Sequence, residues 1–87
     1  MSDNIWFCYI LKCADGSLYT GITTDPSRRE RQHNTGTGAK YTRGRRPVKM
    51  VYCEPADNRA QALRREHTLR TLPRSRKLAL LGTGAAP

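Results

Sequence analysis

The chain has 87 residues, of which 16 are Lys or Arg and 7 are Asp or Glu, so its formal net charge is +9. This length excludes several domains and a large core, because a chain this short buries only about 60% of its unfolded surface. The positive charge favours a polyanion as the partner, with nucleic acid ahead of a membrane surface. The apolar runs of the sequence are too short to span a bilayer.

Two strand-forming segments begin the predicted fold, Ile5–Leu11 and Leu18–Thr23. The first is apolar at successive positions, so both of its faces need cover, and we expect it to be the central strand of a small sheet. The segment before it, Met1–Asn4, is short and polar. We expect it to be a disordered start and not a secretory signal peptide.

The connection between these strands decides where two tyrosines lie. Asp15-Gly16 between apolar runs is a strong hairpin signal. A two-residue turn would place Tyr9 and Tyr19 on opposite faces, whereas a three-residue loop that ends at Gly16 pairs Tyr9 with Gly21. Both hydroxyls would then project from one side of the hairpin. We predict the three-residue loop, because glycine adopts the left-handed conformation that it needs at low cost.

A polar helix is predicted next, over Pro26–Asn34, with Asp25 as its N-cap and proline at its first position. It contains no Leu, Ile, Val, Phe or Met, so it has little apolar surface with which to dock. Arg29 and His33 lie one turn apart on one face. That face is either functional or simply the solvated side of a charged helix.

A basic loop is expected from Thr35 to Arg46, because it holds two glycines near its start and no acidic residue. Its cations lie close together, which is typical of a segment that follows a phosphate backbone. An ordinary basic surface loop is the alternative. The residues expected to contact nucleic acid are Lys40, Thr42, Arg43, Arg45 and Arg46.

A third strand is predicted over Pro47–Cys53, with Pro47 at the position where a missing N–H is tolerated. Simple alternation would place three large side chains on one of its faces: Val48, Met50 and Tyr52. With the first two strands it completes a small antiparallel sheet.

A longer helix follows, capped by Asp57 or Asn58 and ending before Pro73. Glu66 lies within the apolar stripe of this helix. A carboxylate on an inward face is costly unless it binds a cation or is paired. A divalent metal ion and a salt bridge both remain open, the latter with Arg65, Arg70 or Arg29; metal is favoured beside a basic, phosphate-seeking surface.

The last predicted helix runs to Leu81, with Gly82 as its stop and Leu78 and Leu81 directed inward. The fold class is therefore α+β, a three-stranded antiparallel sheet with packed helices in the order β-β-α-β-α-α. We expect one domain over residues 5–82 and a flexible tail over residues 83–87.

Three cysteines, Cys8, Cys13 and Cys53, form neither a Cys-x-x-Cys pair nor a zinc pattern. All three fall in or beside strand segments, where free thiols behave as small apolar side chains. Free thiols persist in a reducing compartment. We therefore expect a cytoplasmic protein.

Several of these residues stand at the spacing of a known motif, and the chain resembles the GIY-YIG endonucleases over about residues 5–81. Phe7 and Thr20 depart from the motif, which has Gly and Ile at these positions. The segment from His33 to Pro47 is similar to small stand-alone bacterial members (UPF0213-like). The residues that match the motif are Tyr9, Tyr19, Gly21, Arg29 and Glu66.

This resemblance implies a metal-dependent DNA endonuclease that acts on branched, flapped or distorted DNA, in repair or recombination near the nucleoid. It implies that Glu66 holds one Mg²⁺ or Mn²⁺ ion and that Tyr9 activates the attacking water, with Tyr19 orienting water or phosphate. His33 is a competing base, because its pKa is ordinarily nearer neutrality. Arg29 can hold the scissile phosphate with two parallel donors.

Two other functions are compatible with the sequence. A basic nucleic-acid-binding domain without catalysis of its own is one, since a lone catalytic module can depend on a protein partner for specificity. An RNA-associated basic protein is the other. No helix presents a row of base-reading side chains, so we expect no sequence specificity.

Overall fold

The computed structural model describes residues 5–81, and the expected disordered start, the Gly82 stop and the tail lie outside this range. The predicted fold class is confirmed, with one short helix added. In chain order the elements are β1 Trp6–Lys12, β2 Leu18–Thr23, α1 Pro26–Thr35, α2 Lys40–Arg43, β3 Lys49–Ala56, α3 Arg59–Thr71 and α4 Arg74–Leu81. The segment predicted as a continuous basic loop therefore contains α2.

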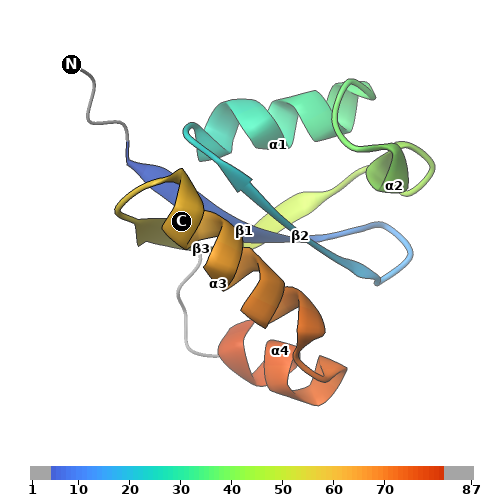
Figure 1. The fold of residues 1–87 in the computed structure, drawn as a ribbon. Coiled ribbons are helices and arrows are strands. Elements are labelled where there is room, and N and C mark those ends of the chain that lie inside the picture. The colour runs from blue at the N-terminus through green and yellow to red at the C-terminus, as the bar shows by residue number, and fades with distance from the viewer. Residues whose placement is uncertain (1–4, 82–87) are drawn as a thin grey trace.

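The sheet is antiparallel with the strand order β2-β1-β3, so β1 is the central strand, as its two apolar faces predicted. Helix α1 lies against one face of the sheet, and α3 and α4 lie against the other (Figure 1). Both outer strands, β2 and β3, therefore have one edge that pairs with no other described strand.

The hairpin between β1 and β2 has the predicted three-residue loop. The Cys13 N–H donates to the Ser17 carbonyl over 2.9 Å, and Gly16 has a φ of 86°, the left-handed conformation that favours glycine. The resulting register pairs Tyr9 with Gly21. The two tyrosines of the motif consequently share the α1 face of the sheet.

Two small clusters of buried side chains cover the two faces of the sheet. The cluster beneath α1 consists of Tyr9, Leu11, Cys13, Val48 and Met50. The cluster beneath α3 consists of Cys8, Ile10, Tyr52 and Leu69. The prediction that Met50 and Tyr52 share a face is wrong, because the pairing of β1 with β3 shifts register between Ile10 and Leu11 and the alternation of β3 breaks there.

Helix α1 docks through hydrogen bonds, which explains why so polar a helix packs on a small domain. The Glu30 carboxylate accepts the backbone N–H of Met50 over 2.7 Å. The Asn34 side chain accepts the Val48 N–H over 2.7 Å and donates to the Val48 carbonyl over 3.0 Å. These contacts satisfy backbone groups of Val48, just before β3, and of Met50 within it, on an edge where no further strand is described. The alternative of a freely solvated helix is therefore wrong.

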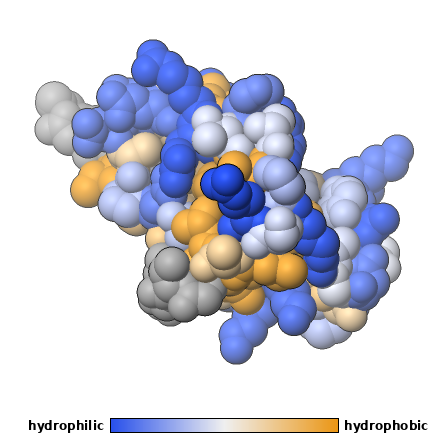
Figure 2. Space-filling model, turned by 90° about the horizontal axis from the view of Figure 1, so that it is seen from below, coloured by the Kyte–Doolittle hydropathy of each residue, from blue (hydrophilic) through white to orange (hydrophobic). Residues whose placement is uncertain are grey.

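Helix α3 begins at the Asn58 cap, whose side chain accepts the Gln61 N–H, and it buries Ala62 and Leu69. Of the two leucines of α4 predicted to face inward, Leu81 packs on the core together with Leu80, whereas Leu78 is 46% exposed. Seen from the α4 side, apolar surface is gathered in the middle of the face, with hydrophilic residues around and across it (Figure 2). No helix within the described part of the chain has the length and apolar character to cross a membrane.

Candidate active site

A buried hydrogen-bonded chain joins β1, α1 and α2. The Tyr9 hydroxyl lies 3.0 Å from Nε2 of His33, and Nδ1 of His33 lies 2.8 Å from Oγ1 of Thr42. Thr42 donates its one hydroxyl proton to the Ala39 carbonyl over 2.9 Å. We therefore assign the Nδ1–H tautomer to His33, in which Thr42 accepts from Nδ1–H and Nε2 accepts the proton of the Tyr9 hydroxyl. The Ala39 N–H also points toward Nδ1, but at 3.4 Å this contact is too long to compete with the 2.8 Å contact to Thr42, so the Nδ1–H tautomer is kept.

Two glycines allow this close packing. A Cβ at Gly21 would lie 2.5 Å from the Tyr9 hydroxyl oxygen, and a Cβ at Gly38 would lie 2.5 Å from Nδ1 of His33. Any side chain at either position would push the phenol or the imidazole away. Gly21, the glycine of the second motif, is thus required because any larger residue at this position of β2 would clash with Tyr9 on the neighbouring strand.

Burial fixes both members of the pair in their neutral forms at pH 7. It raises the pKa of Tyr9 to about 12, although the neighbouring Arg29 acts in the opposite direction. Burial also lowers the pKa of His33 to about 4, and the positive charge of Arg29 adds to that effect. A neutral phenol therefore donates to a neutral imidazole. Tyr9 is 1% exposed and His33 is fully buried, so neither reaches solvent directly.

Tyr19 connects this buried chain to an open pocket. Its ring centroid lies 5.3 Å from that of His33 on one side and 5.8 Å from the stacked ring of Tyr41 on another. The pocket, of about 300 Å³, lies where the edge of β2 meets α2, α3 and α4. Its lining residues are Leu18, Tyr19, Thr20, Tyr41, Glu66, Arg70 and Lys77.

Glu66 faces into this pocket, and its side chain is 14% exposed. Its Oε2 lies 3.3 Å from Nη1 of Arg70, so one of the expected salt bridges is present. Arg65 instead forms a 2.6 Å ion pair with Glu54. The Thr20 hydroxyl, next to Tyr19 on β2, is buried and is the one such side-chain atom without a hydrogen-bond partner within residues 5–81.

Arg29 lies on the α1 side of this arrangement. It is half-buried, and its Nη1 donates to the Gln32 side chain over 3.0 Å. Its influence on the pKa values of Tyr9 and His33 places its charge beside both. Arg29 and Glu66 are not in contact in this structure. Tyr19 connects the two sides of the site, since its ring lies against that of His33 and it also lines the pocket of Glu66.

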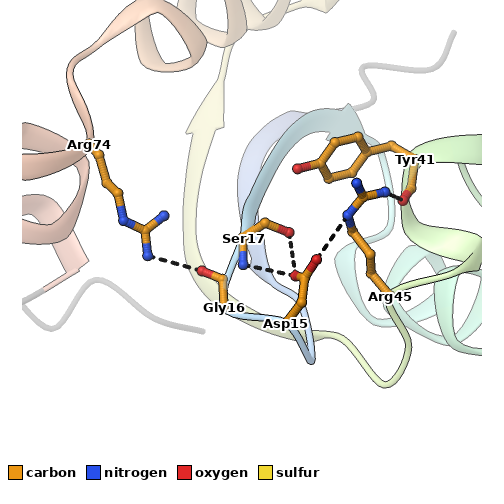
Figure 3. A network of polar contacts seen from close by, with 6 residues as sticks. All are labelled: Asp15, Gly16, Ser17, Tyr41, Arg45 and Arg74. Atoms are coloured by element: carbon orange, nitrogen blue, oxygen red, sulfur yellow. Dashed lines mark hydrogen bonds and ion pairs between the residues drawn. The ribbon is translucent and has the colours of Figure 1, made fainter.

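The tip of the hairpin is tied to α2 and α4 (Figure 3). Arg45 contacts the Asp15 carboxylate over 3.1 Å, donates to the Tyr41 carbonyl over 2.7 Å and places its guanidinium 4.0 Å from the centre of the Tyr41 ring. Arg74 donates to the Gly16 carbonyl over 3.0 Å. These contacts hold Tyr41 at the mouth of the pocket, a position that the sequence did not indicate.

The cations of the expected phosphate-binding segment are placed differently from one another. Arg46 donates to the carbonyls of Arg43 and Asn34 and so braces the loop. Lys40 and Arg43 are exposed, and neither side chain has a partner among the described residues. Thr42 is fully buried and bound to His33. The expectation that Thr42 contacts nucleic acid is therefore wrong, because its hydroxyl holds the imidazole.

The fold and this arrangement define a small α+β domain in which the motif tyrosine Tyr19 lies between a buried histidine and an open pocket. The family model described as the GIY-YIG catalytic domain matches residues 5–79, so the chain belongs to the GIY-YIG family. The chain is 53% identical to a UPF0213 protein of Haloquadratum walsbyi, over 90% of this chain and 88% of that protein. A UPF0213 protein of Staphylococcus saprophyticus is 50% identical, with 90% and 95% covered. Over nine tenths of its length the chain is therefore similar to UPF0213 proteins.

Solved structures agree with the fold. The solution NMR structure of a UPF0213 protein from Bacillus halodurans superposes with a TM-score of 0.60, at 42% identity, and the match covers 95% of this chain and 88% of that one. A protein from E. faecalis, also solved by NMR, gives a TM-score of 0.60 at 43% identity, with 91% and 84% covered.

Proposed function

We propose that this protein hydrolyses phosphodiester bonds of DNA with a divalent cation, and that it acts on branched, flapped or distorted DNA in the cytoplasm. The observation that carries the proposal is the position of Tyr19, between the Tyr9–His33 pair and the pocket of Glu66. Membership of the GIY-YIG family supports nuclease-type chemistry. We further propose that the protein prefers distorted DNA, acts in repair and depends on a protein partner for specificity.

The residues of the pocket fit one Mg²⁺ or Mn²⁺ ion. Mg²⁺ is usually held by one or two carboxylates and substrate phosphates and keeps several of its waters. The pocket offers one carboxylate, Glu66, and its lining includes Thr20, whose buried hydroxyl has no hydrogen-bond partner within residues 5–81. Within residues 5–81 there is no cluster of three or more His, Cys, Asp or Glu side chains that could form a closed protein cage. When bound, the cation would act as a Lewis acid toward the phosphate.

The burial of Tyr9 changes the roles that the family resemblance implied for the two tyrosines. Tyr19 lines the open pocket, so we assign the contact with the attacking water to its hydroxyl. Tyr9 is a positioning residue, because its hydroxyl proton is donated to Nε2 of His33 and its oxygen lies beside Arg29. His33 in turn holds the Tyr9 hydroxyl by a hydrogen bond, and it does not line the pocket.

Arg29 is proposed to bind the scissile phosphate. A guanidinium carries five N–H donors, of which one is used by Gln32 and another faces the Tyr9 hydroxyl. The remaining donors can hold two phosphate oxygens in parallel, which a lysine cannot do. Lys40 and Arg43 on the exposed side of α2 are then available for neighbouring phosphates, whereas Arg45 and Arg46 contribute their charge while they brace the loop.

The test is cleavage of end-labelled duplex, flap and four-way-junction DNA in Mg²⁺, in Mn²⁺ and in EDTA. We expect products from the branched substrates with either cation and none in EDTA. Glu66→Gln and Tyr19→Phe should each lower the rate by at least about a hundredfold, and Arg29→Lys should lower it although the charge is kept. Arg64→Gln, which removes an exposed charge elsewhere on α3, is the matched control. Cleavage by Glu66→Gln at the wild-type rate would overturn the proposal.

A nucleic-acid-binding domain without catalysis is the second candidate. It is favoured by the closed state of the site, since Tyr9 and His33 are sealed from solvent and Glu66 is already paired with Arg70. It predicts binding of branched DNA that EDTA leaves unchanged, with no products in any cation. Competition between branched DNA and structured RNA would separate a DNA-binding protein from an RNA-associated one.

A further inference from the structure

The carboxylate that would hold the cation has a protein partner in this structure. Glu66 and Arg70 lie one turn apart on α3, with Oε2 and Nη1 at 3.3 Å. The Glu66 side chain is 14% exposed and that of Arg70 is 58% exposed. The carboxylate therefore lies within the pocket, while the guanidinium approaches it from the solvent side.

The pocket contains more positive than negative charge. Arg70 and Lys77 line it from α3 and α4, and Glu66 is the one acidic residue among its lining side chains. A divalent cation on Glu66 would leave both basic groups beside it without an anion. Like charges a few ångströms apart repel each other strongly near a protein surface. An added anion, such as a phosphate, would relieve that repulsion.

We propose that Arg70 alternates between two anions: the Glu66 carboxylate in the free protein, and a phosphate of the bound DNA strand once a divalent cation holds Glu66. This inference rests on the cation site proposed above. Arg70 is suited to the exchange, because its exposed side chain can rotate into solvent without disturbing the core, and because a guanidinium binds phosphate oxygens in pairs. Lys77 provides a second positive charge on the same side of the pocket.

Two consequences follow from this competition. In the free protein Arg70 weakens cation binding, because the ion and the guanidinium compete for one carboxylate. In the complex, cation and DNA strengthen each other's binding, and the coupling must be equal in both directions. A simple surface pair on a helix predicts neither effect, since such pairs contribute only a little to stability and engage no ligand.

The first measurement is Mn²⁺ binding to the full chain without DNA, followed by electron paramagnetic resonance. We expect Arg70→Gln to bind Mn²⁺ at least about fivefold more tightly than wild type, the lower end of usual coupling factors. Arg64→Gln removes the same charge from an exposed position of α3 that does not line this pocket, so it controls for net charge. Glu66→Gln should lose Mn²⁺ binding, and circular dichroism should show every variant folded.

The second measurement is binding of fluorescein-labelled flap DNA in EDTA and in Ca²⁺, an oxygen-seeking cation used as the probe. Ca²⁺ should tighten DNA binding by wild type and by Arg64→Gln, and this gain should be largely lost in Arg70→Gln. Mn²⁺ affinity in Arg70→Gln no higher than in Arg64→Gln would overturn the inference, and loss of binding in Glu66→Gln would still support the cation site. Unchanged Mn²⁺ binding in Glu66→Gln would overturn the cation site itself.

Discussion

The Tyr9 hydroxyl is hydrogen-bonded to Nε2 of His33 across 3.0 Å in a site that excludes solvent. This contact crosses from the central strand to a helix with almost no apolar surface. It replaces apolar packing with a hydrogen-bonded chain that continues to Thr42. Such chains stabilise a fold only when each member is satisfied. Removing the hydrogen-bonding group of Tyr9, His33 or Thr42 should therefore lower the free energy of unfolding.

Acid should destabilise the protein through His33. Its pKa is lowered from 6.5 to about 4 in the folded protein, so between these values the unfolded chain binds more protons than the native one. The contribution of neutral His33 to the free energy of unfolding is then fully present above pH 6.5. It is lost as the pH drops toward 4, by about 3 kcal/mol in total. Urea denaturation followed by circular dichroism from pH 7.5 to 4 measures the effect. The slope should persist in His67→Gln, an exposed histidine, and be reduced in His33→Gln.

Thr42→Val should destabilise the protein by about 1–3 kcal/mol, because it leaves Nδ1–H of a buried imidazole without an acceptor. The change conserves shape, so little packing is lost. Thr68→Val is the control, because the Thr68 hydroxyl is exposed on α3. This change should alter the free energy of unfolding by less than about 0.5 kcal/mol. Nitrogen-15 NMR of wild type should show the Nδ1–H tautomer of His33. The opposite tautomer would contradict the proposed direction of the hydrogen-bonded chain.

Gly21→Ala should be among the most damaging single-methyl changes in the chain. The added Cβ would lie 2.5 Å from the Tyr9 oxygen and 3.2 Å from the Tyr19 ring, so both tyrosines must shift. We expect a loss of about 1–3 kcal/mol together with a loss of DNA cleavage. Gly44→Ala is the matched control, because nothing lies within 4 Å of its Cβ and its φ is −90°. Equal stability of the two variants would argue against the observed contact.

Asn34→Ala should free Val48, the residue just before β3, from α1. The variant loses both hydrogen bonds to Val48, at an expected cost of about 1–3 kcal/mol. The Val48 amide should then exchange with deuterium much faster than in wild type. Thr35→Ala, one residue along the same helix, has an exposed hydroxyl and should leave that exchange rate unchanged. Slow exchange of Val48 in Asn34→Ala would show that the side chain does not hold the strand.

Local patterns in the sequence predicted much of the fold and the outline of the site. Asp15-Gly16 predicted the three-residue loop, and that loop fixed the register which places Tyr9 and Tyr19 on one face. The position of Glu66 in an apolar stripe predicted a carboxylate directed into the structure. These inferences succeeded because turn conformation and side-chain direction depend on neighbours a few residues apart.

Contacts between distant segments decided the rest. The burial of His33 depends on Tyr9 and Thr42, which lie in other elements, and the helix that carries His33 shows no apolar periodicity that would reveal it. The register shift opposite β1 moved Tyr52 to the other face of the sheet, and no local pattern marks that shift. The sequence alone determined which polar groups are present and how they are spaced along each element. The tertiary structure determined which of them are sealed and which line a pocket, because burial is a property of the packed neighbours.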